Sequence, residues 1–79
     1  MTRVEIRAWL DEHGDVRVTA RDSVTAGYCV AGVRAWYQRN DLPVRDSFRD
    51  GVSAEFAYSV NDPQADASIV AAIARQEKA

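Results

Sequence analysis

The residues best suited to bind a charged partner lie in the first 21 positions, where four arginines and a tryptophan alternate with apolar side chains. Guanidinium groups bind phosphate and carboxylate through paired hydrogen bonds, and an indole ring can stack on a base or on another ring. With Glu5 included, these side chains carry a local charge of about +3. The predicted partner-binding residues are Arg3, Arg7, Trp9, Arg17 and Arg21.

A structural interpretation competes with this one, because arginine commonly solvates the outer face of a β-ribbon. Substitution of Arg7 and Arg17 separates the two: a contact surface loses binding, whereas a structural face loses thermal stability. The carboxylates of the second half of the chain also leave open an acidic surface that mimics nucleic acid, although helix caps and solvated faces account for most of them.

Catalysis is not indicated by any cluster of reactive residues. Cys29 is the only cysteine and His13 the only histidine, and they fall in different predicted elements, so the thiol has no neighbouring base. We expect Cys29 to be buried and inert. The spacing of a metal site, a glycine-rich phosphate loop or a nucleophile elbow is also missing. The sequence therefore predicts a protein that is not an enzyme and needs no cofactor or metal.

The element predicted to position the arginines is a β-hairpin over residues 1–21. Apolar residues alternate with polar ones on both sides of Asp11–Gly14, a segment that suits a three-residue loop with a bulge. The favoured register pairs apolar residues with apolar residues and creates two polar pairs: Glu5 with Arg21, and Trp9 with Arg17. The open edges of such a ribbon also predict a homodimer through strand pairing.

Residues 22–79 are predicted to be helical. A long central helix from Val24 to about Arg39, capped by Asp22 or Ser23, places Trp36 and Tyr37 in the core. Gly27 and Gly32 within it indicate close packing against another backbone. Three further helices follow: one capped by Asp41 that ends at Gly51, one that begins after Val52-Ser53, and a last one from Pro63 to about Gln76. The predicted class is α+β, with the hairpin packed on the central helix.

Length and composition limit the remaining classes. Seventy-nine residues predict a single domain, and ten Lys and Arg against twelve Asp and Glu give a net charge of −2, so general attraction to nucleic acid or to a membrane is not expected. The single cysteine fits a reducing compartment. The first residues lack the apolar run of a signal peptide, and no stretch is apolar enough to span a membrane. We therefore expect a cytoplasmic protein.

One stretch of the sequence resembles a known group of proteins. Cys29-x-x-Gly32-x-x-x-Trp36-Tyr37 precedes Leu42, Phe48, Gly51, Glu55 and a helix over residues 62–72. Over about residues 29–72 this pattern is similar to small uncharacterised proteins encoded in proteobacterial prophages. The chain departs from the pattern at Asn40-Asp41, where relatives often have His-Gly.

The resemblance implies a phage-encoded interaction protein that acts in the bacterial cytoplasm. Small, slightly acidic phage proteins without catalytic residues include anti-CRISPR inhibitors, so it implies a protein that binds a type I Cascade complex and blocks engagement of target DNA. Two alternatives stay open: a small nucleic-acid-binding module that uses the arginine face directly, and an accessory protein of phage assembly or packaging.

Overall fold

The computed structural model describes all 79 residues and has six helices and one two-stranded sheet. The helices are α1 (Arg3–His13), α2 (Ala20–Thr25), α3 (Val30–Arg39), α4 (Val44–Asp50), α5 (Ala54–Val60) and α6 (Pro63–Lys78), and the strands are β1 (Arg17–Val18) and β2 (Val52–Ser53). The α+β class is confirmed at this coarse level. None of the helices has both the length and the apolar character needed to cross a bilayer.

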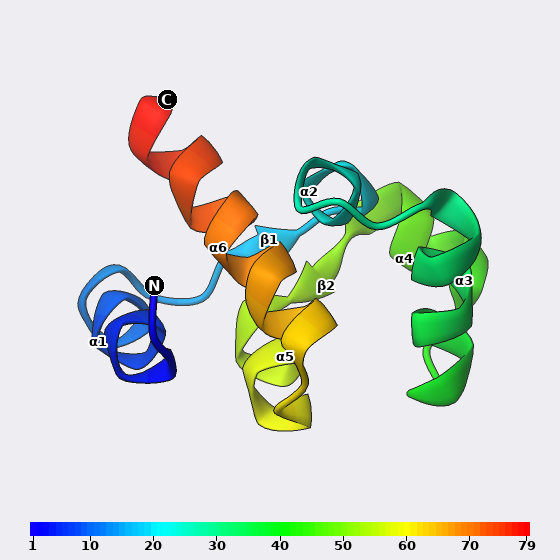
Figure 1. The fold of residues 1–79 in the computed structure, drawn as a ribbon, viewed down its shortest axis with the longest axis horizontal. Coiled ribbons are helices and arrows are strands. Elements are labelled where there is room, and N and C mark those ends of the chain that lie inside the picture. The colour runs from blue at the N-terminus through cyan, green and yellow to red at the C-terminus, as the bar shows by residue number, and fades with distance from the viewer.

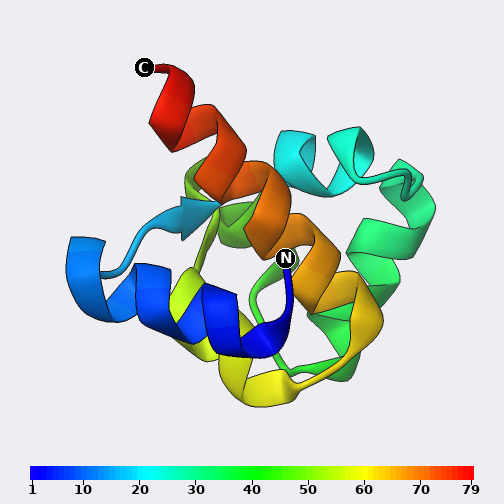
Figure 2. The same cartoon turned by 60° about the vertical axis from the view of Figure 1, so that its left-hand side comes forward.

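Helix α6 organises the molecule. It crosses in front of the small sheet, with α1 on one side and α3 and α4 on the other (Figures 1 and 2). Strands β1 and β2 are antiparallel, with Val18 opposite Val52. The core is one cluster of 13 buried residues, and its largest fully buried side chains come from α1, α3 and α6. Those side chains are Ile6, Leu10, Val33, Ile69 and Ile73.

The predicted hairpin over residues 1–21 is wrong, because its first half is helix α1. Thr2 and Glu5 form a capping box: the Thr2 hydroxyl accepts from the Glu5 amide, and the Glu5 carboxylate accepts from the Thr2 amide at 2.8 Å. Ile6 and Leu10, four residues apart, then face the core from one side of the helix. Only Arg17–Val18 form a strand, and it pairs with β2 instead of with residues 3–10.

The long central helix is also wrong, because the segment divides into α2 and α3 at Gly27. This glycine has a φ of +105°, a conformation that ends a helix and that favours glycine. The cap of α2 is Thr19 instead of Asp22 or Ser23. The close packing expected at the two glycines is absent as well: a Cβ at Gly27 would meet nothing within 4 Å, and one at Gly32 would meet only the Cys29 sulfur.

The second half agrees better with the predictions. Trp36 and Tyr37 are buried, and Ser53 caps α5. Helix α4 ends at Gly51 as expected, although Pro43 and not Asp41 occupies its N-cap. Helix α6 begins at Pro63 and runs to Lys78. Because the strands have two residues each and pair within the chain, the structure gives no basis for the expected homodimer through long strand edges.

Candidate functional site

The first two predicted contact residues, Arg3 and Arg7, hold helices together. Arg3 forms an ion pair of 2.6 Å with Asp66 of α6 and donates to the Tyr58 carbonyl oxygen at 2.9 Å. Arg7 is paired with Glu55 of α5 at 2.6 Å and with Asp11 of its own helix at 2.8 Å. These carboxylates, Glu55 first, raise the pKa of Arg7 above its ordinary value. Both guanidinium groups therefore fasten α1 to the rest of the fold.

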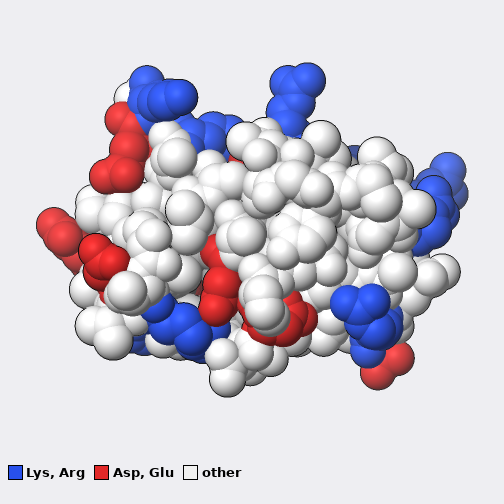
Figure 3. Space-filling view, viewed as in Figure 1, with Lys and Arg blue, Asp and Glu red and all other residues white.

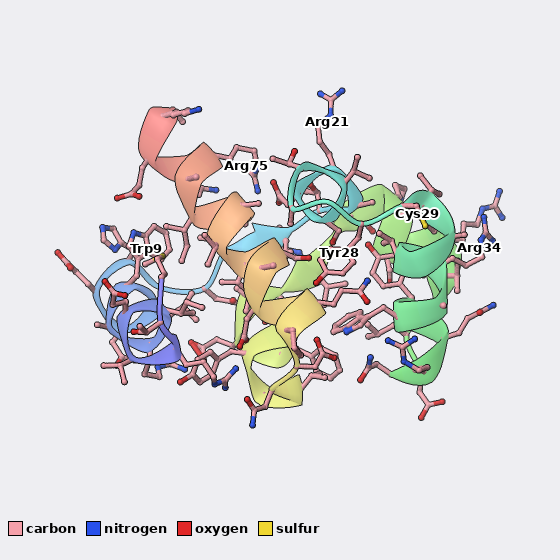
Figure 4. All side chains as sticks on the ribbon, in the orientation of Figure 1. Trp9, Arg21, Tyr28, Cys29, Arg34 and Arg75 are labelled. Carbon is pink, nitrogen blue, oxygen red and sulfur yellow. The ribbon has the colours of Figure 1, made fainter.

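The other three predicted residues have different surroundings from these two. Trp9 stacks on His13, with ring centroids 4.2 Å apart. Arg17 donates to the carbonyl oxygens of Asp50 and Gly51 at 3.2 and 2.7 Å. Arg21 extends into solvent from α2, far from Trp9 on α1 (Figure 4). The predicted pairs of the hairpin therefore do not form, and of the four arginines only Arg21 is free of an intramolecular partner.

The unpaired arginines gather in one part of the chain. Nine of the ten cationic residues are arginine, and five of them bind carboxylates or carbonyl oxygens inside the molecule. The four that do not are exposed and come from α2, α3 and α4: Arg21, Arg34, Arg39 and Arg45. Between residues 23 and 40 the sequence contains no aspartate or glutamate. The charged side chains of residues 23–40 are therefore all positive, in a protein whose net charge is negative.

Three of these arginines, Arg21, Arg34 and Arg39, lie on two helices joined by a four-residue turn, Ala26–Cys29. Gly27 donates its amide to the Val24 carbonyl at 2.9 Å and Tyr28 donates to the Ser23 carbonyl at 3.1 Å, which is the bonding pattern of a Schellman motif. In Figure 1, α2 is seen almost end-on and α3 from the side, so the two axes cross. Two crossing short helices with a glycine in a four-residue turn form a helix-turn-helix arrangement. We call residues 19–39 the helix-turn-helix unit.

Cys29 starts the second helix of this unit. Its Sγ accepts a hydrogen bond from the Gly32 amide at 3.4 Å, so the thiol occupies the N-cap position of α3. The side chain is exposed, which makes the prediction of a buried thiol wrong. The structure has no group of three or more His, Cys, Asp or Glu side chains that could hold a metal ion.

Helix α3 has a core face and a solvent face. Val33, Trp36 and Tyr37 are buried. The residues at positions 31, 34 and 38 lie on the opposite side at helical spacing and are exposed. They are Ala31, Arg34 and Gln38, a small residue at the start of the helix followed by two long side chains that carry several donors. The aromatic core contacts fix which face of α3 reaches solvent.

Helix α2 is held on α6 by a buried carboxylate. Asp22 is 3% exposed and accepts two hydrogen bonds of 3.0 Å from the Arg75 guanidinium, and a third of 2.8 Å from the Thr19 amide. Burial alone raises the pKa of Asp22, but the bonds from Arg75 and Thr19 outweigh it and hold the pKa below its ordinary value. Figure 4 shows Arg75 extending from α6 towards α2.

The surface over the unit differs in charge from the rest of the visible face. Figure 3 shows acidic side chains over the left-hand and lower parts of the molecule, whereas the area above α2 and the start of α3 is uncharged with basic side chains at its margin. Arg21 and Arg34 project from that area in Figure 4. A ligand with negative charge would therefore meet little repulsion from acidic side chains over this area.

Sequence reasoning did not find Arg34, Gln38, Arg39 or Arg45. A sequence feature could have found the first three: the acid-free run over residues 23–40, with Gly27 placed between two short apolar periodicities. The apolar periodicity instead places this glycine in the interior of one long predicted helix. Comparison with known proteins adds no further assignment, because no protein-family model, curated protein or solved structure matches this chain.

Proposed function

We propose that this protein binds nucleic acid through its helix-turn-helix unit and the adjoining helix α4, and that it does so without catalysis. The observation that carries the proposal is the location of the four unpaired arginines, all of which lie between residues 21 and 45. Guanidinium groups that have no carboxylate partner are free to bind phosphate. The proposal keeps the nucleic-acid-binding alternative of the sequence analysis but moves its surface from residues 3–21 to α2, α3 and α4.

Salt dependence tests the proposal. If Arg21, Arg39 and Arg45 each bind one phosphate, the slope of log K against log salt concentration is about −2.7, and affinity falls about 40-fold between 50 and 200 mM salt. The measurement is fluorescence anisotropy of a labelled nucleic acid at the two concentrations. Failure to bind at 50 mM salt would overturn the proposal.

Two variants with the same change in charge locate the surface. Arg45→Ala removes an exposed, unpaired guanidinium from α4, whereas Lys78→Ala removes an exposed ammonium from the end of α6. The first variant should reduce the magnitude of the salt slope by about 0.9 and the second should leave it unchanged. Equal effects of the two substitutions would show diffuse attraction and contradict a defined site.

A protein partner is the second candidate, favoured by exposed apolar residues on the same unit. Val24 is 47% exposed and Val30 is 56% exposed, and both lie on the helix-turn-helix unit. The inhibition of a type I CRISPR interference complex, and the role in phage assembly or packaging, stay predictions that depend on the resemblance to prophage proteins. Binding to isolated Cascade subunits in the absence of any affinity for nucleic acid would favour this candidate.

A further inference from the structure

We propose that α3 enters the major groove of B-form duplex DNA, where Arg34 binds a guanine and Gln38 an adenine. The inference rests on the proposed function and adds to it the class of nucleic acid and the residues that give sequence preference. Its basis is the position of these two side chains on the solvent face of α3, within the helix-turn-helix unit.

The dimensions of α3 suit this groove. Helix α3 has ten residues, and an α-helix with its side chains is about 10 to 12 Å across, which fits the major groove of B-form DNA, about 12 Å wide. In helix-turn-helix proteins the second helix lies in the major groove and its first residues contact base edges. Here the first turn of α3 carries Ala31, whose small side chain lets the helix backbone approach the bases closely.

The two outward side chains are the types that read purines. Arginine donates two hydrogen bonds to O6 and N7 of guanine, and glutamine pairs in a bidentate manner with N6 and N7 of adenine. The Arg34 guanidinium carbon lies 5.6 Å from the centroid of the Phe48 ring, and it has no ion pair. This aromatic contact orients the guanidinium while it leaves the N–H donors of Arg34 free for a base.

The remaining unpaired arginines are placed to bind the DNA backbone. Arg21 projects from α2, the helix that crosses the backbone in this geometry, while Arg39 ends α3 and Arg45 lies on α4. Contacts of this kind set the position of the protein but carry no sequence information. The division of roles therefore separates Arg34, which should affect sequence preference, from Arg45, which should affect all sequences equally.

Duplex RNA should be a poor ligand. Its A-form major groove is deep and narrow, so side chains of an inserted helix cannot read the bases there. The discriminating experiment measures anisotropy with a DNA duplex, an RNA duplex and a DNA single strand, each with the same 20-base sequence. Selection from a randomised DNA duplex then provides the preferred site.

We expect the DNA duplex to bind at least about tenfold more tightly than the RNA duplex. Arg34→Lys keeps the charge but loses the planar fork, so it should reduce discrimination at one guanine by about 5- to 150-fold while the salt slope stays the same. Arg45→Ala should weaken binding to every sequence by the same factor and reduce the slope. Circular dichroism of both variants verifies that the fold is retained.

The outcomes distinguish this inference from the proposed function. Absence of binding to all three nucleic acids overturns both. Binding in which RNA duplex or single strand equals duplex DNA, or in which Arg34→Lys affects all sequences equally, overturns the major-groove inference and leaves the proposed function standing.

Discussion

The buried carboxylate of Asp22 provides the most quantitative test of how the helix-turn-helix unit is held in place. Asp22→Asn keeps the shape of the side chain and removes its charge. The substitution weakens the two hydrogen bonds of 3.0 Å from Arg75. It also weakens or removes the hydrogen bond from the Thr19 amide, because the group that faces this amide becomes either a neutral oxygen or an amide nitrogen. The result should be a loss of stability that depends on the ionisation of one group.

The size of the expected loss of stability depends on how far solvent reaches the Asp22–Arg75 ion pair. Hydrogen bonds to charged groups contribute about 1.5 to 3 kcal/mol each, but Arg75 is 43% exposed and solvent screens part of this energy. We therefore expect a loss of about 2 kcal/mol in the free energy of unfolding. In a domain of this size that loss lowers Tm by about 8 to 16 °C. Urea and thermal unfolding at pH 7, followed by circular dichroism, measure both quantities.

The contribution of Asp22 to stability should depend on pH in one direction. Because the pKa of Asp22 is lower in the folded protein than its ordinary value of 3.8, its contribution is fully present above that value and is lost as pH falls through the folded pKa. The difference between the wild-type protein and Asp22→Asn should therefore shrink towards pH 2. Glu12→Gln, a change of an exposed carboxylate without an ion pair, serves as the control. A loss below about 0.5 kcal/mol at pH 7, or a difference undiminished at pH 2, would refute the reasoning.

Three further predictions concern stability and access. Gly51 has a φ of +77°, and a Cβ there would lie 2.9 Å from the Val18 carbonyl oxygen. Gly51→Ala should therefore lower the free energy of unfolding by about 2 kcal/mol or more, measured by chemical denaturation, and an unchanged midpoint would contradict this. Thr2→Ala removes one side of the capping box and should cost about 1 kcal/mol, with faster hydrogen exchange confined to α1; uniform exchange would be inconsistent with a local effect. The exposed Cys29 thiol should react with a disulfide reagent without unfolding, whereas reaction only in denaturant would show that it is buried.

The N-terminal segment shows why strand periodicity misled the sequence analysis. Val4, Ile6, Ala8 and Leu10 alternate, yet the helix buries only Ile6 and Leu10 and leaves Val4 79% exposed. The two patterns share the positions 6 and 10, so apolar spacing alone cannot choose between them. The capping box of Thr2 and Glu5, three residues apart, was the local feature that favours a helix.

The elements with strong boundary residues were predicted well. Ser53 caps α5 and Asp62 caps α6, because each side chain accepts a hydrogen bond from a free amide of the first turn. Pro63 suits the first position of α6 because it has no amide hydrogen to satisfy. Gly27 is the counterexample, since a glycine inside an apolar periodicity is compatible with a helix interior and with a turn. Its φ of +105° in the folded structure shows that it forms the turn.

The candidate site could be predicted only in part. The sequence predicts a surface of unpaired arginines, but it does not show which arginines are unpaired. Arg3 meets Asp66 across 63 positions of the chain and Arg7 meets Glu55 across 48, and such partners become visible only in the folded structure. Arg21 is the one predicted contact residue that lies within the final candidate surface.

Chemical-shift mapping of the protein with a mixed-sequence DNA duplex identifies the residues that bind DNA. Amide resonances of the uniformly labelled protein are recorded at 50 mM salt as the duplex is added. Binding by the helix-turn-helix unit predicts that the largest shifts fall on α2, the turn at residues 26–29 and the solvent face of α3, with α1 and the end of α6 unaffected. Shifts centred on α1, or no shifts at all, would contradict the account.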